Sequence, residues 1–238
     1  MMTKSTSYSN ANNPIICAID ATDIAAAKKL VQSVRGSVGA IKLGLEFFTA
    51  NGAAGVAQVA GDVPLFLDLK FHDIPNTVEG AVRATKGINA FMMTLHTQGG
   101  KAMMQAAAKA AKDLANKPMI IGVTMLTSLD EVDLESVGIK NDIKNQVSKL
   151  ADLAQESGLD GVVCSPHEIE ILRKQCGADF KLIVPGIRPS GSASGDQKRV
   201  MTPKEALAKG ADYLVIGRPI TEVENPAKAA QDILASLN

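Results

Sequence analysis

The sequence LFLDLKFHDIPNT at residues 65–77 joins an apolar run, two opposite charges and the beginning of an amphipathic stretch. The apolar run predicts a strand over 65–69, and the pattern of apolar residues that follows predicts a helix over 77–86. A strand followed closely by a helix is the unit of a parallel sheet, because parallel neighbours are joined by helical crossovers. The fold therefore depends on how often this unit recurs along the chain.

The same unit recurs until the chain has eight predicted strands and eight predicted helices. The predicted strands cover residues 15–19, 40–43, 65–69, 91–96, 119–124, 161–165, 182–184 and 213–216. The predicted helices cover residues 24–34, 45–59, 77–86, 101–115, 143–157, 166–176, 203–209 and 226–237. Pro166, Pro203 and Pro226 stand at first helical turns, where a missing N–H is tolerated, and Thr202 and Asn225 are typical N-cap residues.

Eight such units in 238 residues predict one closed (β/α)8 barrel of the TIM type rather than an open sheet or two domains. The barrel domain is predicted over residues 14–238, and the polar segment 1–13 is predicted to be a flexible N-terminal tail. Catalytic residues of this fold lie at the C-terminal ends of the strands. Polar residues at those ends are therefore the candidates for a functional site.

The composition excludes several classes of protein. Lysine and arginine total 25, and aspartate and glutamate also total 25, so no net charge favours nucleic acid or an anionic membrane. With no tryptophan, two tyrosines and six phenylalanines, the chain lacks the stacking residues of single-strand binders. It has no apolar stretch long enough for a membrane span, and its three cysteines are scattered. These features predict a cytoplasmic protein that binds neither nucleic acid nor membrane.

Charged residues lie at the ends of the first three predicted strands. Asp68 and Lys70 are two residues apart, so they share one face of their strand. Asp20 and Lys42 hold similar positions on the first two strands, and Asp73 follows in the next loop. A salt bridge that merely fills the barrel is one interpretation, since buried charges persist when they are paired. The gathering of such residues at neighbouring strand ends favours the other interpretation, a catalytic charge cluster.

Alternating charges constrain the chemistry of the lysines. Nearby carboxylates favour a protonated lysine, whereas a lysine that forms a Schiff base must be neutral to attack a carbonyl. Lys70, flanked by Asp68 and Asp73, is therefore poorly placed for aldolase chemistry and well placed to donate a proton.

A second group of candidates follows the last two predicted strands. The segment PGIRPSGSASGDQ at 185–197 is rich in glycine and serine, and GRPI at 217–220 follows the eighth strand. Loops at these places often bind phosphate in (β/α)8 barrels, through backbone N–H groups and arginine forks such as those of Arg188 and Arg218. The alternative is a merely flexible loop, but long loops in compact domains tend to be functional. We therefore expect a phosphorylated substrate.

These motifs together resemble one enzyme family. The segment DLKFHDIPNT at 68–77, preceded by Asp20 and Lys42 and followed by PGIR at 185–188 and IGRP at 216–219, is similar to the pattern of orotidine 5'-phosphate decarboxylases. The D-x-K-x-x-D part alone is shared with related sugar-phosphate barrels. The resemblance implies a homodimer that uses no cofactor or metal. It also implies conversion of orotidine 5'-monophosphate to UMP and CO2 in de novo pyrimidine biosynthesis.

The resemblance further implies a role for each matching residue. Lys70 would donate the proton, Asp68 would lie beside the substrate carboxylate, and Lys42 would be a charge partner near the ribose. Asp73 and Thr77 would come from the partner subunit. The remaining substrate contacts would be Asp20 at the ribose, Thr127 and Ser128 at the pyrimidine, Gln197 and Arg218 at the phosphate, and Pro185, Arg188 and Gly217 beside them.

The reaction itself supports an electrostatic mechanism. Loss of CO2 from C6 leaves an anion in the plane of the pyrimidine ring, which ring resonance cannot delocalise. The sequence has no obvious thiamin, pyridoxal or metal motif to accept this charge. An ammonium group about 4 Å away contributes roughly 4 kcal/mol at an effective dielectric constant of 20. Closure of the loop at 186–199 and binding of the phosphate would supply much of the rest.

Two alternatives remain open at this point. A related sugar-phosphate lyase would use Mg2+ and an enediolate, with an acidic ligand where this chain has Lys42, a cation that would repel the metal. His72, His96 and His167 lack the spacing of metal ligands. The second alternative is a catalytically silent barrel that binds a nucleotide, which would have no need of the charge cluster.

Overall fold

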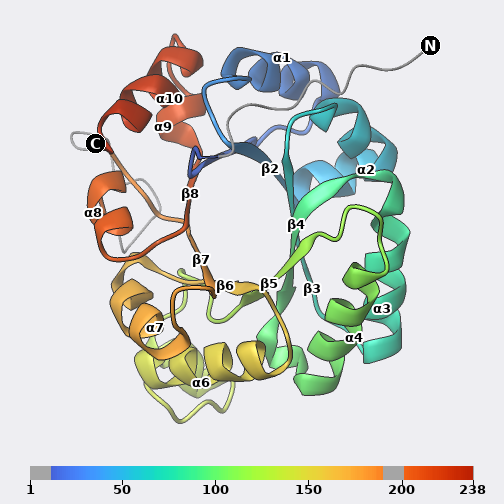
Figure 1. Cartoon of the computed structure of the whole chain (residues 1–238), viewed down its shortest axis with the longest axis vertical. Helices are drawn as coiled ribbons and strands as arrows, with labels where there is room; N and C mark the ends of the chain where they lie inside the picture. Colours follow the sequence, from blue (N-terminus) through green and yellow to red (C-terminus); the bar gives the residue numbers. More distant parts are fainter. Residues whose placement is uncertain (1–11, 190–200, 238) are drawn as a thin grey trace.

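A computed structural model describes residues 12–189 and 201–237. Eight parallel strands close into a barrel in the order of the sequence, with β8 beside β1 (Figure 1). They are β1 (Ile15–Ala18), β2 (Ala40–Gly44), β3 (Leu65–Phe71), β4 (Ala90–His96), β5 (Met119–Val123), β6 (Gly161–Val163), β7 (Lys181–Val184) and β8 (Tyr213–Ile216). The predicted (β/α)8 barrel is confirmed, and every predicted strand overlaps an observed one.

Helices form the outer ring of the barrel (Figure 1). They are α1 (Ile24–Val34), α2 (Leu45–Ala60), α3 (Pro75–Ala84), α4 (Lys101–Lys112), α5 (Glu131–Ser136), α6 (Ile143–Glu156), α7 (Ile169–Cys176), α8 (Pro203–Ala208), α9 (Arg218–Thr221) and α10 (Pro226–Ala235). Three 3-10 turns accompany them: η1 (Thr85–Gly87), η2 (Thr97–Gly99) and η3 (Pro166–Glu168). The helix predicted to begin at Pro166 therefore begins with a 3-10 turn that leads into α7.

Apolar side chains fill both faces of the sheet, which explains why the strands read as continuous apolar runs rather than alternating ones. On β3, Leu65 and Leu67 point outward and pack beneath the helices, whereas Phe66 points into the barrel. The inner cluster fills the barrel with side chains from seven strands: Ile16, Ala18, Ala40, Phe66, Met92, Ile121, Ile183 and Val215. In the described residues, the barrel is thus filled with side chains below the C-terminal ends of its strands.

The helix starts carry the caps that the sequence predicts. The Thr202 side chain accepts from the Glu205 N–H, and the Glu205 carboxylate accepts from Thr202 in return. Asn225 caps α10 by accepting from the Lys228 N–H at 3.0 Å. Such caps satisfy N–H groups that have no partner inside the helix. The N-terminal ends of α8 and α10 are therefore fixed by local chemistry.

Two short helices were not predicted. The sequence predicts no helix between those at 101–115 and 143–157, but residues Glu131–Ser136 form α5, with a capping box between Asp130 and Asp133. The segment after β8 was interpreted as a loop, but it forms α9 from Arg218 to Thr221. Both helices are too short to show a periodic apolar pattern, so sequence periodicity could not reveal them.

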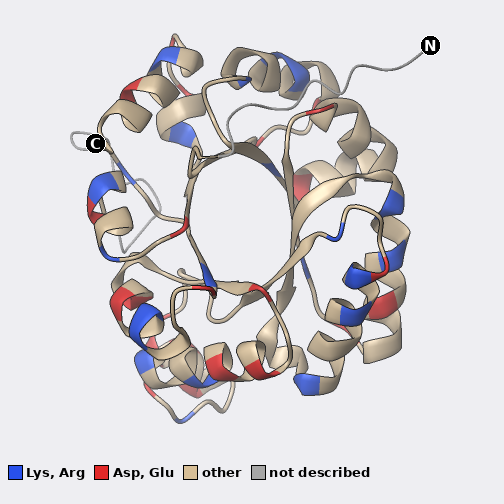
Figure 2. Cartoon of the chain, viewed as in Figure 1, with Lys and Arg blue, Asp and Glu red and all other residues tan. Residues whose placement is uncertain are grey.

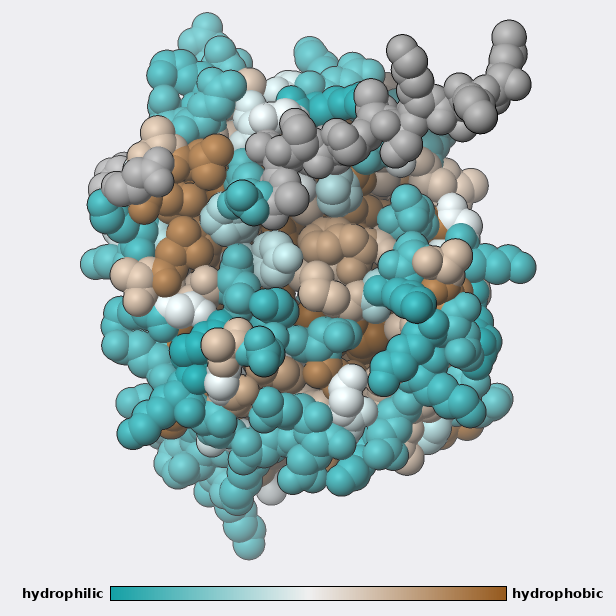
Figure 3. Space-filling model, in the orientation of Figure 1, coloured by the Kyte–Doolittle hydropathy of each residue, from teal (hydrophilic) through white to brown (hydrophobic). Residues whose placement is uncertain are grey.

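The outer surface carries charges of both signs. Lysine and arginine residues are interspersed with aspartate and glutamate residues around the ring of helices (Figure 2). In the space-filling view, most residues at the edge of the visible face are hydrophilic. Apolar residues are visible among hydrophilic ones nearer the centre of that face (Figure 3). Among the described helices, none has the length and apolar character needed to cross a membrane.

The predicted tail over 1–13 falls mainly on residues 1–11, which lie outside the described residues. Asn13, at the end of that segment, is buried; its side chain donates to the Ser37 carbonyl at 3.0 Å and accepts from the Ile15 N–H at 3.0 Å. Asn13 thus ties the start of β1 to the loop before β2. For residues 1–11, the flexible tail stays a prediction.

Candidate active site

A cavity of about 520 Å³ opens at the C-terminal ends of the strands. This volume lies within the range of small-molecule sites in proteins, about 300 to 1,000 Å³. Nine of the residues predicted for the site line it: Asp20, Lys42, Asp68, Lys70, Thr127, Pro185, Arg188, Gly217 and Arg218. The fold thus gathers residues from Asp20 near the N-terminus to Arg218 near the C-terminus.

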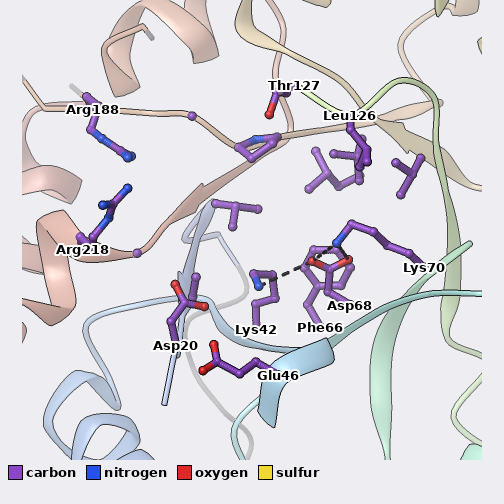
Figure 4. A pocket seen from close by; sticks show the side chains of 18 of the residues that line it. Asp20, Lys42, Glu46, Phe66, Asp68, Lys70, Leu126, Thr127, Arg188 and Arg218 are labelled. Atoms are coloured by element: carbon purple, nitrogen blue, oxygen red, sulfur yellow. Dashed lines mark hydrogen bonds and ion pairs between the residues drawn. The ribbon is translucent and has the colours of Figure 1, made fainter. Parts of the chain in front are cut away.

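Three charged side chains form the centre of this cavity (Figure 4). The Lys70 ammonium donates to both carboxylate oxygens of Asp68, each at 2.9 Å. The Lys42 ammonium lies 3.5 Å from Oδ2 of the same carboxylate. The side chains of Lys42 and Asp68 are only 14% and 13% exposed, and that of Lys70 is 26% exposed. One largely buried carboxylate is thus shared by two ammonium groups that face the cavity.

Backbone geometry at the end of β3 places Lys70. Asp68 and Lys70 point to the same side of the strand, while Leu67 and Leu69 are buried in the outer core, as the spacing predicts. The pairing with β4 shifts register between Leu67 and Phe71, and Lys70 has a φ of 52°. A positive φ is uncommon for a residue with a side chain and is found where the surroundings enforce it, often at active sites.

The environment of Asp68 decides its charge. Burial raises the pKa of this carboxyl, but the charges of Lys42 and Lys70, together with hydrogen bonds from Lys70 and Thr94, lower it by more. The net pKa therefore lies below the ordinary value of an aspartate. Asp68 is accordingly an anion at neutral pH, although it is largely buried.

Asp20 lies at the edge of the cavity, two residues beyond the end of β1. In the described part of the chain, the ion pairs of the cluster join Lys42, Asp68 and Lys70, and Asp20 lies apart from them. Asp20 is close to the turn after β8: a Cβ at Gly217 would lie 3.3 Å from its Oδ2. A larger residue at position 217 would therefore crowd Asp20 and the cavity wall.

Arg188 and Arg218 point toward each other at another part of the cavity wall (Figure 4). Burial and the nearby charge of Arg218 lower the pKa of Arg188. Arg188 follows β7, and its backbone N–H donates to the Met201 carbonyl at 3.0 Å, while Ile187 and Met201 form an isolated parallel bridge. The two ends of the predicted phosphate loop are therefore held together at its base. Two converging guanidinium groups make this wall suitable for an anion.

The remaining predicted residues lie elsewhere. Asp73 and Thr77 are exposed and are not among the residues that line the cavity, and Asp73 accepts from the Ile74 N–H at 2.7 Å. Ser128 is exposed and also lies outside the lining, next to Thr127. Gln197 lies outside the described residues. A single subunit thus forms the cavity without Asp73, Thr77 or Ser128.

Several lining residues were not predicted. Glu46, near the start of α2, and Glu222, directly after α9, add two carboxylates. Apolar residues also line the cavity, among them Phe66, Met125 and Leu126. Nothing in the local sequence separates these residues from ordinary helix and core positions. Only the closure of the barrel places them around the cavity.

Two histidines lie beside the charge cluster. The rings of His72 and His96 are 5.5 Å apart between centroids and tilted by 39°. Burial lowers the pKa of His96, the charges of His72 and Lys70 lower it further, and Asp68 opposes them. No group of three or more histidine, cysteine, aspartate or glutamate side chains in residues 12–189 and 201–237 is arranged to hold a metal ion.

Comparison with known proteins identifies the family. The sequence pattern of the orotidine 5'-phosphate decarboxylase / HUMPS family matches residues 13–233. The chain is 53% identical over 231 residues to an orotidine 5'-phosphate decarboxylase from Paramagnetospirillum magneticum, covering 94% of this chain and 98% of that protein. It is 52% identical over 237 residues to the Moorella thermoacetica protein of the same name, covering 96% and 93%.

Solved structures agree with this assignment. The crystal structure of orotidine 5'-phosphate decarboxylase from Lactobacillus acidophilus has a TM-score of 0.83 and 32% identity, covering 95% of this chain and 99% of that one. An uncharacterized conserved protein from Geobacillus kaustophilus also has a TM-score of 0.83, with 34% identity and coverage of 94% and 100%. The resemblance inferred from the motifs is confirmed: the chain belongs to the orotidine 5'-phosphate decarboxylase / HUMPS family.

Proposed function

We propose that this protein decarboxylates orotidine 5'-monophosphate to UMP and CO2, the last step of de novo pyrimidine biosynthesis. The observation that carries the proposal is the cluster in which Lys42 and Lys70 share the Asp68 carboxylate inside the cavity. Family membership supports the same reaction, since relatives covering almost the whole chain bear that name. The free, buried thiols of the three cysteines agree with a reducing cytoplasm as its location.

The cavity offers a different contact for each part of this substrate. Arg188 and Arg218 converge on one wall, where they would bind the phosphate. Gln197, which lies outside the described residues, would add a further contact to the phosphate. Asp20 would bind the ribose hydroxyls, with Lys42 between ribose and reaction centre. Thr127 and the apolar lining residues Met125 and Leu126 would face the pyrimidine. Further contacts with the substrate would come from Pro185, Gly217 and Ser128.

The charge cluster would carry out the chemistry. The bond between C6 and the carboxylate breaks, CO2 leaves, and the electron pair stays on C6 in the plane of the ring. The ammonium of Lys70 stabilises this localised carbanion and then transfers a proton to C6, which gives UMP. Asp68 would lie beside the substrate carboxylate and hold Lys70 in place. Binding energy from the remote phosphate would orient the substrate and help to exclude water. No step in this scheme requires a cofactor.

The active form would be a homodimer with shared sites. Asp73 and Thr77 are exposed in the isolated subunit, and Ile74 between them leaves 66% of its surface exposed. The exposure of this segment in the isolated subunit agrees with the subunit contact that the resemblance to orotidine 5'-phosphate decarboxylases implies. We therefore assign Asp73 and Thr77 to the site of the partner subunit.

The deciding experiment follows the ultraviolet absorbance change when purified protein is mixed with orotidine 5'-monophosphate. The expected result is rapid conversion to UMP that persists after dialysis against EDTA. Inert protein would refute the proposal and leave a nucleotide-binding barrel without catalysis. Activity lost with EDTA and restored by Mg2+ would instead indicate the metal-dependent sugar-phosphate chemistry of related barrels.

A further inference from the structure

Thr94 on β4 forms hydrogen bonds with Asp68 and Lys70 of the charge cluster. It is not among the residues that line the cavity. We propose that Thr94 is a positioning residue whose hydroxyl fixes the Asp68 carboxylate and the Lys70 backbone, and thereby holds the Lys70 ammonium toward the reaction centre. This inference rests on the proposed decarboxylation, because it assigns Thr94 an effect on that step. Thr94 lies outside the sequence motifs that contain the predicted catalytic residues.

The contacts of the Thr94 hydroxyl leave it little freedom. Oγ1 donates to Oδ1 of Asp68 at 2.8 Å and accepts from the backbone N–H of Lys70 at 2.9 Å. A hydroxyl has a single proton, so the direction of both bonds is fixed once that proton points to the carboxylate. Thr94 is 1% exposed, which leaves little room for water to replace these bonds. One buried hydroxyl thus joins the acid of the cluster to the backbone of its lysine.

These bonds hold Lys70 at both ends. Its backbone N–H bonds to Thr94, and its ammonium bonds to Asp68, which itself accepts from Thr94. The register shift at the end of β3 gives the Lys70 N–H a side-chain acceptor on β4 rather than a strand carbonyl. A lysine at a φ of 52° keeps such a conformation only where its surroundings enforce it. Thr94 supplies that constraint.

Loss of the hydroxyl would act on the geometry of the lysine. Without it, the part-buried N–H of Lys70 loses the acceptor it has in Thr94, and a donor shielded from water without a partner is costly. The end of β3 would relax from its left-handed conformation, and Asp68 would lose one of the bonds that orient it. A displacement of a reacting group by about 1 Å is enough to slow an enzyme by about a hundredfold. The expected loss therefore falls on kcat rather than on substrate binding.

The test compares Thr94→Val, which keeps the shape but removes the hydroxyl, with Thr94→Ser, which keeps the hydroxyl. Thr85→Val is the control. Thr85 is also a buried threonine, and its hydroxyl donates to the Val82 carbonyl at 2.7 Å. It lies in η1, which precedes the N-terminal end of β4, away from the charge cluster at the C-terminal end. We expect Thr94→Val to lower kcat by about ten- to a hundredfold with KM changed less than about threefold. Thr94→Ser and Thr85→Val should stay within about threefold of the wild type.

Wild-type kcat in Thr94→Val, or an equal loss in Thr94→Ser, would overturn the proposal. If Thr94→Val does not fold, Thr94→Ala takes its place, with the same loss expected and the same recovery in Thr94→Ser.

A second readout is independent of turnover. The crystal structure of Thr94→Val should show Lys70 outside the positive φ region, or a Lys70 ammonium more than about 3.5 Å from Oδ1 of Asp68. Unchanged positions of both groups would refute the positioning role. A wild-type protein that does not act on orotidine 5'-monophosphate would refute the proposed function instead, and the structural comparison would still decide the role of Thr94.

Discussion

The ammonium group of Lys70 lies 2.9 Å from each of the two carboxylate oxygens of Asp68. This symmetric contact places a cation and an anion side by side at the end of β3, both facing the cavity. Lys42 approaches the same carboxylate at 3.5 Å from β2, so Asp68 is the shared centre of the cluster. A substrate carboxylate bound here would meet an anion, and a carbanion formed here would meet a cation.

Removal of the Lys70 ammonium should almost abolish turnover. Lys70→Ala removes the group that we propose as the cation beside C6 and as the proton donor, so kcat should fall by more than about a thousandfold. Steady-state kinetics would measure this loss, and UMP affinity and the unfolding transition would show whether the variant folds. Near-normal kcat in a folded variant would end the assignment of Lys70 as proton donor.

Replacement of Asp68 by asparagine should destabilise the protein in a pH-dependent way. The pKa of Asp68 is lowered in the folded state, so its contribution to the free energy of unfolding is present above the ordinary aspartate pKa of about 4. That contribution is lost as the pH falls through the lower folded pKa. At pH 7, Asp68→Asn should cost about 3 kcal/mol, because it leaves two buried ammonium groups without their carboxylate.

Urea unfolding at a fixed protein concentration, at several pH values from 7 to 3, would measure this effect. The difference between wild type and Asp68→Asn should shrink below pH 4. A difference that is equally large at pH 3 and pH 7 would contradict the lowered pKa.

The same substitution tests whether Asp68 repels the substrate carboxylate. If it does, Asp68→Asn should bind an inert, carboxylate-bearing analogue of orotidine 5'-monophosphate more tightly than the wild type does. Calorimetric titration of both proteins would measure the two affinities, with UMP as the ligand that lacks the carboxylate. Equal affinities for the analogue would count against repulsion, which is a contested mechanism in general.

Truncation of Arg218 should chiefly weaken recognition of the phosphate. A hydrogen bond to a charged group contributes about 1.5 to 3 kcal/mol, so Arg218→Ala should lower kcat/KM by about ten- to a hundredfold. The variant should also reduce the preference for UMP over uridine in binding assays. Arg35→Ala is the matched control, since Arg35 pairs with Asp62 and both side chains are about half exposed, at 52% and 46%. An unchanged kcat/KM in Arg218→Ala would contradict the role of a phosphate ligand.

Mixed dimers should test the shared sites. Lys70→Ala and Asp73→Ala are each expected to be nearly inactive alone. In a mixed dimer, one site would combine an intact Lys70 with an intact Asp73 from the other chain, and the second site would lack both. Random mixing makes half of the dimers mixed, so activity should recover to about a quarter of the wild-type level. No recovery after verified subunit exchange would place both residues in the site of one chain.

The sequence was sufficient for the fold and for the nine predicted residues that line the cavity. Recurrent apolar runs and helical stretches predicted eight strands that the structure contains. The spacing of Asp68 and Lys70 predicted that both would face the same side, and both line the cavity. These predictions succeeded because they rest on the periodicities of strands and helices and on the rule that places polar strand ends at the barrel mouth.

Other features could not be predicted from the sequence. The left-handed backbone of Lys70 follows from a register shift against β4, and register depends on which strands become neighbours. Glu46, in the first turn of α2, and Leu126, in the loop after β5, line the same cavity because the barrel closes. The helices α5 and α9 are too short for a periodic pattern. The backbone of Lys70 and the cavity lining depend on contacts between segments that are distant in the chain.

The amino-acid sequence by itself determined the order of strands and helices, the barrel, and the charged residues at the strand ends, because those follow from local periodicity and residue chemistry. Only the tertiary structure decided that Lys42 and Lys70 share one carboxylate, that Arg188 and Arg218 converge, and that Thr94 touches both Asp68 and Lys70. The reason is physical: distances between side chains on different strands are set by barrel closure and strand register, which no local stretch of sequence encodes.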